Sequence, residues 1–297
     1  MIGGVHSGYG AVNDEESISG LRLVDELGAR LFDTAAPYGG GHSERLLGQV
    51  FGVRDDIFIV TKFGMEPHDT ADIDRPELRT STAIRASAEQ SRKNLRRDRL
   101  DLLLFHVNGH PPEQSVEVFD TLDDVGEGRI AAYGWSNDSV TGVSAFSDQA
   151  NFIAVENDFN VFMPASELMA YAEAHGLLSI NRLPLAMGML TGKYNGGKAV
   201  GADDIRAAPV PWMTFFKDGV AHQDYVRCLE AIRELLTVGG RSLAQGALCW
   251  ILARSPVALP VPGFKTPAQI RDNLGALEKG PLPPSVMLEI EVLLQRA

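Results

Sequence analysis

The sequence has little cysteine, no long apolar stretch and no excess of positive charge. Only two of its 297 residues are cysteine, Cys228 and Cys249, and they form no CxxC pair, which excludes a disulfide framework and predicts a reducing, cytoplasmic location. No apolar run approaches the roughly 20 residues that cross a membrane, and the sequence does not begin with a basic-then-apolar signal. A net charge of −12 argues against nucleic acids and anionic lipids as partners.

The common nucleotide-binding and metal-binding motifs are missing as well. The run Gly39-Gly-Gly41 lacks the GxGxxG spacing of a dinucleotide fingerprint. The segment from Gly188 to Lys193 is one residue short of a P-loop and has no Ser or Thr after its lysine. His106 and His110 are separated by Val-Asn-Gly and are not expected on one helix, so no metal site is predicted.

What the sequence does contain is a regular alternation of apolar and amphipathic segments. Seven apolar runs are typical of strands: residues 30–34, 57–63, 100–106, 130–136, 152–157, 177–181 and 258–261. They are mostly continuous, which indicates parallel strands that are covered on both faces. Helices are predicted between them, at residues 14–27, 82–95, 115–127, 166–175 and 242–253. We expect Asp14 to cap the first helix and Gly28 to end it. Because no linker divides the chain, residues 1–297 predict a single α/β domain.

Four polar side chains lie at or just after the ends of the first three predicted strands. Asp33 and Lys62 end the first two, Tyr38 follows in the loop after Asp33, and His106 ends the third. In a parallel βα barrel these ends share one mouth. A phenol is a weak acid at pH 7, and we expect the ammonium of Lys62 to lower its pKa. Asp33 would hold Lys62, and His106 would polarise a substrate carbonyl, so the set predicts carbonyl reduction.

These residues lie in longer motifs that resemble the signature of the aldo-keto reductase family. The first is Asp33-Thr-Ala-Ala-Pro-Tyr38-Gly, followed by Gly41-His-Ser-Glu44-Arg-Leu-Leu-Gly48. The others follow in family order: Thr61-Lys62-Phe-Gly64, Asp101-Leu-Leu-Leu-Phe-His106, Gly134-Trp-Ser-Asn137, Pro184-Leu-Ala-Met-Gly-Met-Leu-Thr-Gly-Lys-Tyr194 and Pro260-Val-Pro-Gly-Phe-Lys-Thr266. The resemblance spans nearly the whole chain. It implies a (β/α)8 TIM barrel, NADPH bound in an extended pose, reduction of an aldehyde or ketone to the alcohol, and Tyr38 as the general acid.

The resemblance also implies which residues hold the cofactor. Ser136 and Asn137 would hold the nicotinamide amide. The residues implied at the pyrophosphate are Leu185, Gly188, Lys193 and, from the following loop, Arg206. The positions that match the family's site for the adenosine 2′-phosphate and its surroundings are Gly263, Lys265, Thr266, Gln269, Asp272 and Asn273. A lysine in this place favours NADPH over NADH, because a partly desolvated phosphate needs an opposing charge.

Two site positions depart from the family pattern. Glu156 stands where the family normally has a glutamine that helps to grip the nicotinamide amide, and an ionised carboxylate cannot donate a hydrogen bond. Arg182 stands where an aromatic side chain frequently stacks on the nicotinamide. Because the ends of consecutive barrel strands are neighbours, we predict that Glu156 and Arg182 form an ion pair and offset each other's charge.

A larger departure lies at the beginning of the sequence. Relatives have a hairpin and a first barrel strand ahead of the segment that matches Ile2-Gly-Gly4, and residues 1–5 are barely long enough for a strand. Eight strands close such a barrel, whereas we count seven. Either the recorded start lies downstream of the true one, which we favour, or the barrel is open and exposes unpaired edges.

Two other functions fit part of the pattern. The first is a regulatory module that binds NADPH with little turnover, as in the potassium-channel β subunits of the same superfamily. The second is a barrel glycosidase with two catalytic carboxylates, such as Asp33 and Glu156, but it leaves Lys62 without a role. For a reductase the partner is a small-molecule carbonyl substrate, and we expect the loops at 65–76 and 195–220 to select it.

Overall fold

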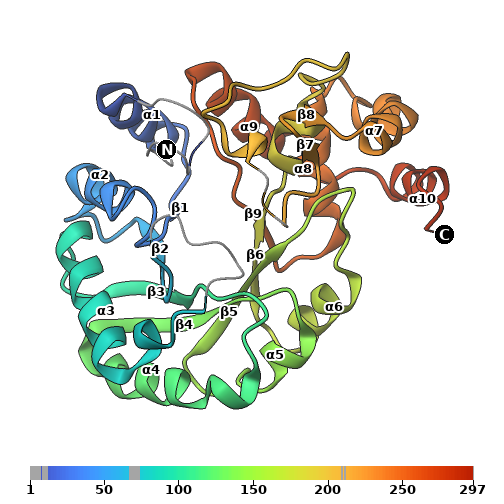
Figure 1. Ribbon diagram of the computed structural model, residues 1–297. Coiled ribbons are helices and arrows are strands. Elements are labelled where there is room, and N and C mark those ends of the chain that lie inside the picture. Colours follow the sequence, from blue (N-terminus) through green and yellow to red (C-terminus); the bar gives the residue numbers. More distant parts are fainter. Residues whose placement is uncertain (1–7, 9–12, 67–73, 209, 211, 297) are drawn as a thin grey trace.

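The centre of the protein is a parallel sheet that curls on itself, with helices outside it (Figure 1). The computed structural model describes residues 8, 13–66, 74–208, 210 and 212–296. The strands are hydrogen-bonded in the order β1-β2-β3-β4-β5-β6-β9. Their bounds are β1 Leu31–Asp33, β2 Phe58–Phe63, β3 Leu100–Phe105, β4 Ile130–Ser136, β5 Phe152–Asp158, β6 Leu178–Arg182 and β9 Ala258–Pro260. All seven predicted strands are confirmed, each end lying within one residue of the predicted one.

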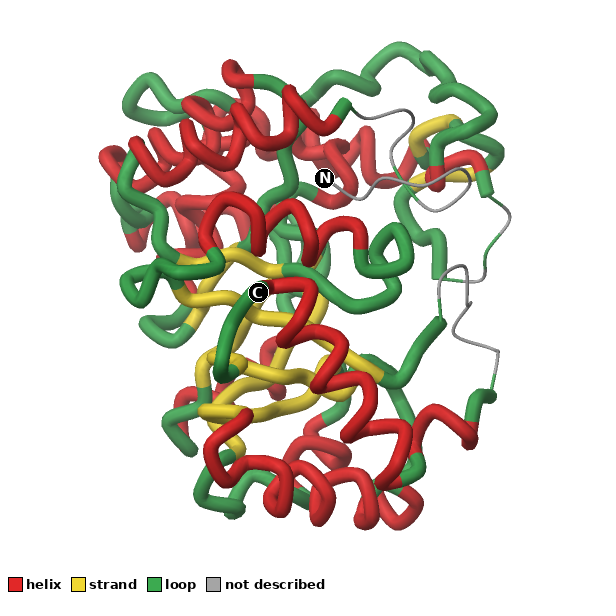
Figure 2. The backbone as a smooth tube through the Cα atoms, turned by 90° about the vertical axis from the view of Figure 1, so that its left-hand side faces the viewer, coloured by secondary structure: helices red, strands yellow, loops and turns green. Residues whose placement is uncertain are grey.

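Helices enclose the sheet, as the view turned by 90° also shows (Figure 2). They are α1 Asp14–Glu26, α2 His42–Phe51, α3 Ser81–Leu95, α4 Val116–Arg129, α5 Val140–Ser144, α6 Ser166–Ala174, α7 Gln223–Leu236, α8 Leu243–Arg254, α9 Pro267–Lys279 and α10 Pro284–Leu293. The five predicted helices are among them. The predicted cap of α1 is wrong by one residue, because it is Asn13 whose Oδ1 accepts the backbone N–H of Glu16 at 3.1 Å. Gly28 follows the helix with a φ of 93°, as its predicted end requires.

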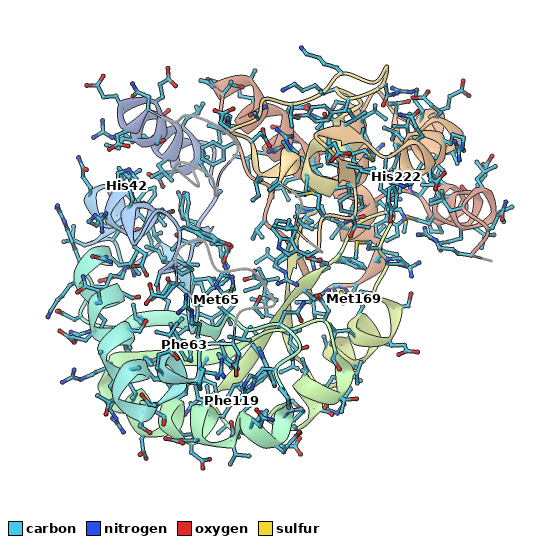
Figure 3. The ribbon with its side chains drawn as sticks, in the orientation of Figure 1. His42, Phe63, Met65, Phe119, Met169 and His222 are labelled. Atoms are coloured by element: carbon cyan, nitrogen blue, oxygen red, sulfur yellow. The ribbon has the colours of Figure 1, made fainter. Side chains whose placement is uncertain are left out.

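Side chains of the sheet alternate between its inside and the surrounding helices. The inside is filled by Val60, Leu102, Leu104, Ala132, Ala154 and Ile180. The side chains that alternate with these face the helices. The ring centres of Phe105 and Trp135 lie 6.2 and 5.3 Å from that of Phe119 on α4. Figure 3 labels Phe119, which lies between the sheet and the helices. This alternation decides which residues near the strand ends face inward.

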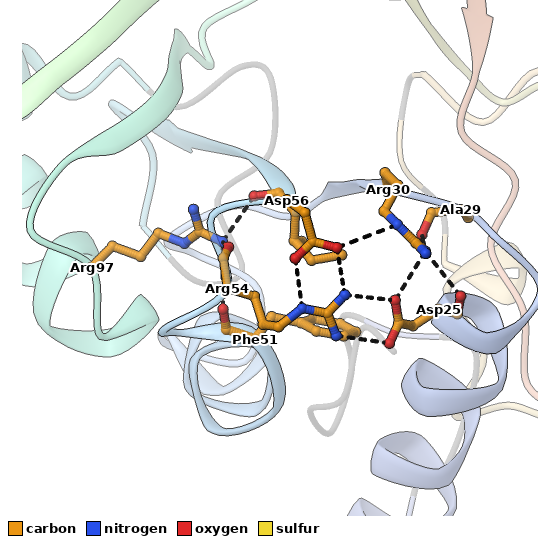
Figure 4. Close-up of polar contacts among 8 residues, drawn as sticks. Asp25, Ala29, Arg30, Phe51, Arg54, Asp56 and Arg97 are labelled. Atoms are coloured by element: carbon orange, nitrogen blue, oxygen red, sulfur yellow. Dashed lines mark hydrogen bonds and ion pairs between the residues drawn. The ribbon is translucent and has the colours of Figure 1, made fainter.

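A polar network fixes the turn that leads into β2 (Figure 4). Arg54 contacts Asp25 of α1 at 3.0 Å and Asp56 at 2.6 Å. Arg97, which follows α3, donates from Nη2 to the carbonyl oxygens of Arg54 and Ile57, both at 2.8 Å. The network therefore ties two helices to the start of the second strand.

The sheet has two edges in the part of the chain that the structure describes. There β1 and β9 each pair on one side only, so the sheet comprises seven of the eight strands of a closed barrel. The candidate strand at residues 1–5 lies outside the described residues. The loop at 195–220, which we expect to help select the substrate, contains the short 3-10 helix Ile205–Ala207 and β7 Phe216–Lys217, which pairs with β8 Val220–Ala221. Among the described helices, none has the length and apolarity that spanning a bilayer requires.

Candidate active site

Six polar side chains form an arc inside the carboxyl end of the sheet. They lie within two residues of the carboxyl ends of six consecutive strands: Asp33, Lys62, His106, Ser136, Glu156 and Arg182. Lys62 stands two positions beyond the inward-facing Val60, and Glu156 two positions beyond Ala154, so both face inward. Parallel strands end on the same side. The structure thus brings the predicted strand-end residues Asp33, Lys62 and His106 close to three of the predicted cofactor residues, Ser136, Glu156 and Arg182.

Lys62 is fully buried at the centre of this arc. Its Nζ lies 2.5 Å from Asp33 Oδ1 and 3.2 Å from Glu156 Oε2, and it donates to the Thr34 carbonyl oxygen at 2.9 Å. Burial lowers the pKa of Lys62, but the two carboxylates, Asp33 first, outweigh it and raise that pKa. The ammonium is therefore charged at every physiological pH.

Tyr38 lies over this ammonium, in the loop that follows β1. The centre of its ring is 5.5 Å from Lys62 Nζ, as predicted. The predicted net decrease of its pKa is wrong. Burial raises the pKa of Tyr38, Lys62 lowers it, and Asp33 and Glu156 raise it again, so that it lies above the ordinary value of 10. Tyr38 is consequently a neutral hydroxyl at pH 7.

His106 also lies beside the phenol. Its ring meets that of Tyr38 edge-on, with 6.0 Å between the ring centres. Burial, followed by the positive charges of Lys62 and Arg182, holds the pKa of His106 well below its usual value of 6.5. Its buried Nδ1 atom has no hydrogen-bond partner among the described residues. A neutral imidazole can donate from one ring nitrogen, which suits it to a carbonyl oxygen.

The predicted ion pair between Glu156 and Arg182 is wrong. Arg182 contacts Asp158 at 3.1 Å and Asp138 at 2.9 Å, whereas Glu156 contacts Lys62. The pairing register explains the difference, because Arg182 stands opposite Asp158, while Glu156 stands opposite Ile180. Sequence reasoning missed both aspartates, although the period of two along β5 places Asp158 on the same face as Glu156.

Glu156 is the least solvated carboxyl group of the arc. Its side chain is 1% exposed; Oε2 has the 3.2 Å contact with Lys62 Nζ, and Oε1 has no hydrogen-bond partner among the described residues. Burial and the nearby Asp33 raise the pKa of Glu156 from 4.5 to about 7, although Lys62 and Arg182 oppose the shift. Asp33 and Glu156 both contact the ammonium of Lys62. A glycosidase with these two catalytic carboxylates gives Lys62 no role, so the contact does not support that alternative.

The arc offers groups that fit a carboxamide such as that of nicotinamide, which has one N–H₂ donor and one carbonyl acceptor. The buried Glu156 Oε1, which has no hydrogen-bond partner among the described residues, is a suitable acceptor. Ser136 Oγ accepts from Arg182 Nη1 at 3.0 Å, and its own hydroxyl proton is left for donation. Ser136 and Glu156 therefore match the two halves of the amide.

Asn137 faces partly away from the arc. Its Oδ1 accepts the backbone N–H of Ser139 at 2.8 Å, just before α5. Its buried Nδ2 has no hydrogen-bond partner in the described part of the chain and lies 2.5 Å from the place that a Cβ on Gly142 would take. Gly142 thus makes room for this amide, and the contact of Asn137 with a nicotinamide stays a prediction.

The residues predicted at the pyrophosphate come from one turn and one loop. Leu185 precedes the 3-10 turn Ala186–Thr191, in which Gly188 has a φ of 92°, a left-handed conformation that favours glycine. Arg206 donates to the Met187 carbonyl oxygen at 2.9 Å. Its Nη1 lies 3.5 Å from the place of a Cβ on Gly188. The loop is therefore fastened to the turn by Arg206.

The two cations of this region have different surroundings. Arg206 is buried and paired with Asp204 at 2.6 Å, so its charge is balanced within the loop. Lys193 is exposed, with its Nζ 5.4 Å from the centre of the Tyr194 ring, over which Arg206 also lies at 4.9 Å. Sequence reasoning did not find Asp204.

The residues predicted around the 2′-phosphate gather at the start of α9: Gly263, Lys265, Thr266, Gln269, Asp272 and Asn273. Thr266 caps the helix by accepting the backbone N–H of Gln269 at 3.3 Å, and Gln269 Oε1 accepts that of Lys265 at 2.7 Å. Asn273 donates to the Gly263 carbonyl oxygen at 3.4 Å. An exposed lysine beside a helix N-terminus is suited to a phosphate.

Comparison with known proteins places this chain in a family. The Aldo/keto reductase family profile matches residues 1–295. The aldo-keto reductase yakc, NADP(+), of Schizosaccharomyces pombe is 26% identical over 291 residues, which cover 93% of this chain and 82% of the relative. A probable voltage-gated potassium channel subunit beta of Arabidopsis thaliana is 27% identical over 300 residues, which cover 95% and 88%.

A solved structure has the same fold. The aldo-keto reductase from Klebsiella pneumoniae, crystallised in complex with NADPH, superimposes with a TM-score of 0.70 at 21% sequence identity. The match covers 98% of this chain and 89% of that one. Since the family profile extends over residues 1–295, the chain belongs to the aldo/keto reductase family.

Proposed function

We propose that this protein uses NADPH to reduce an aldehyde or ketone to the alcohol, in the reducing, cytoplasmic compartment that its cysteine usage predicts. The observation that carries the proposal is the buried ammonium of Lys62, 2.5 Å from Asp33 and 5.5 Å from the centre of the Tyr38 ring. The cofactor is supported by the NADP(+) in the name of the yeast relative and by the NADPH complex of the Klebsiella enzyme.

Tyr38 supplies the proton of this reaction. Its hydroxyl stays neutral at pH 7 because its pKa is raised, so the proton is present for transfer to the carbonyl oxygen. NADPH, when bound, supplies the hydride that reduces the carbonyl carbon. Lys62 stabilises the phenolate left on Tyr38, and Asp33 holds Lys62 in place through their 2.5 Å ion pair.

His106 orients the substrate. Because its pKa is well below the usual value, the imidazole is neutral and donates one hydrogen bond without adding a charge. Its edge-on contact with Tyr38, at 6.0 Å between ring centres, directs both groups to one carbonyl oxygen. The substrate is then held between the acid and a second donor.

The cofactor is held by three groups of residues along the carboxyl ends of the strands. At the nicotinamide these are Ser136, Asn137, Glu156 and Arg182. At the pyrophosphate they are Leu185, Gly188, Lys193 and Arg206. At the adenosine 2′-phosphate they are Gly263, Lys265, Thr266, Gln269, Asp272 and Asn273. Three observations support these roles. The donors and acceptors of the arc match those of the nicotinamide amide, Arg206 holds the turn at Gly188, and the residues assigned to the 2′-phosphate lie together at the start of α9.

Replacing Tyr38 by phenylalanine tests the proposal. We expect Tyr38→Phe to lower the rate of aldehyde reduction about 10²- to 10⁴-fold and to leave NADPH affinity, measured by quenching of tryptophan fluorescence, unchanged. Tyr171→Phe is the matched control, because Tyr171 lies on the outer helix α6 and its hydroxyl forms a hydrogen bond with Ser147 at 2.7 Å.

The same experiment separates the alternative function. If the protein is a regulatory module that binds NADPH with little turnover, the wild type will bind the cofactor but reduce none of a panel of aldehydes and ketones. In that case Tyr38→Phe changes nothing, and the proposed reduction is contradicted.

A further inference from the structure

Two carboxylates share one buried ammonium in this site. Lys62 Nζ lies 2.5 Å from Asp33 and 3.2 Å from Glu156. With both acids ionised, the three side chains carry a net charge of −1 beside the Tyr38 ring. A low-dielectric interior disfavours two like charges at such close range, so one acid takes up a proton more readily than in water.

The geometry identifies Glu156 as the acid that holds this proton. Its side chain is 1% exposed, against 15% for Asp33, and water therefore solvates Asp33 better. Asp33 accepts a hydrogen bond from Lys62 at 2.5 Å, whereas Glu156 has only the longer contact of its Oε2 with Lys62 Nζ, at 3.2 Å, and its Oε1 has no hydrogen-bond partner among the described residues. A carboxylate with less solvent and the longer, single contact with the ammonium is the less stable of the two.

The other charges near Glu156 do not remove this imbalance. Glu156 interacts electrostatically with four charged or titratable groups: Asp33 on β1, Tyr38 in the following loop, Lys62 on β2 and Arg182 on β6. Arg182 is already paired with Asp158 and Asp138. Ionisation of Glu156 therefore adds a negative charge that acts directly on Lys62 and Tyr38.

We propose that Glu156 is a positioning residue for the reduction, and that only its protonated form leaves the charge of Lys62 available to stabilise the Tyr38 phenolate. This inference rests on the proposed function. In the reactive form the Tyr38 O–H bond breaks, a new O–H bond forms on the substrate, and Glu156 keeps its own proton. The raised pKa of Glu156, about 7, puts both forms within the neutral range.

The first test is the pH dependence of kcat for aldehyde reduction with NADPH in the wild-type chain, Glu156→Gln and Asp158→Asn. We expect wild-type kcat to fall about tenfold per pH unit above the Glu156 pKa. Glu156→Gln should lose this inflection, whatever the level of its own kcat. Asp158→Asn, which removes a carboxylate from the same face of β5, should keep it. An inflection retained in Glu156→Gln overturns the proposal.

The second test needs no turnover. The absorbance of the phenolate is titrated with pH in the chain without cofactor. It is measured for the wild type and for Glu156→Gln, each with and without Tyr38→Phe, and the difference that Tyr38→Phe makes is the ionisation of Tyr38. We expect the Tyr38 pKa to be lower in Glu156→Gln than in the wild type. An unchanged Tyr38 pKa overturns the inference even if the protein is an active reductase. A lowered pKa without any reduction instead contradicts the proposed function alone.

A third measurement applies if Glu156→Gln does not fold. The infrared C=O band of a buried, protonated carboxylic acid should fall to half its low-pH intensity at the midpoint of the pH–rate profile of the wild-type chain and disappear above it. A wild-type kcat that is flat through the neutral range contradicts the proposal without any variant.

Discussion

Lys62 Nζ and Glu156 Oε2 are 3.2 Å apart, and neither side chain is exposed by more than 1%. Because of this contact the field of Lys62 acts on a second carboxylate as well as on Tyr38. Burial, Asp33 and Glu156 together outweigh Lys62, so the pKa of Tyr38 is raised. The electrostatics of the site therefore depend on the protonation of one side chain, Glu156.

Removing the ammonium should destabilise the fold, because Asp33 and Glu156 would face each other without a cation between them. We expect Lys62→Met to lower the free energy of unfolding at pH 8 by roughly 3–5 kcal/mol, measured by urea denaturation. Adding Glu156→Gln should recover part of the loss. A double variant no more stable than Lys62→Met would show that the two side chains are not coupled.

The stability of the protein should depend on pH through Glu156. Its pKa is 4.5 in an unfolded chain and about 7 in the fold. The protonated group therefore favours folding below pH 4.5, and this contribution is lost as the pH rises through 7. We expect Glu156→Gln to be more stable than the wild type by roughly 3 kcal/mol at pH 8 and nearly equal to it at pH 4.5. A difference in unfolding free energy that does not vary with pH contradicts this expectation.

The sequence was sufficient for the strands but not for the contacts at their ends. The apolar runs located β3 and β5 to within one residue, because buried parallel strands are continuous in sequence. The partner of Arg182 was missed, because it depends on a register that places Asp158, rather than Glu156, opposite it. The direction of the Tyr38 pKa was missed because burial, which acts most strongly on it, is a property of the packed chain.

The turn into β2 should depend on Arg97. Its buried guanidinium donates to the carbonyl oxygens of Arg54 and Ile57 at 2.8 Å and contacts Asp101 at 3.1 Å. We expect Arg97→Ala to lower the free energy of unfolding by roughly 2–4 kcal/mol, since several buried acceptors lose a charged donor. Arg54→Ala, in the same network but more exposed, should cost much less, and equal losses in the two variants would argue against this explanation.

Cofactor preference should depend on Lys265 at the start of α9. An exposed ammonium beside a helix N-terminus strengthens binding of the 2′-phosphate, which only NADPH carries. We expect Lys265→Ala to weaken NADPH binding about tenfold and to leave NADH binding unchanged, both measured by fluorescence titration. Equal weakening of the two cofactors would assign Lys265 a role unrelated to the phosphate.

The proposed reaction requires that Tyr38 delivers the proton while Lys62 stabilises the phenolate. Its most direct test is a single turnover, in which protein loaded with NADPH is mixed with an aldehyde and cofactor oxidation is followed in H₂O and in D₂O. We predict rapid oxidation in the wild type, slower oxidation in D₂O because a proton moves in the same step, and a decrease of about 10²- to 10⁴-fold in Tyr38→Phe. Oxidation at the wild-type rate in Tyr38→Phe with NADPH still bound would contradict it.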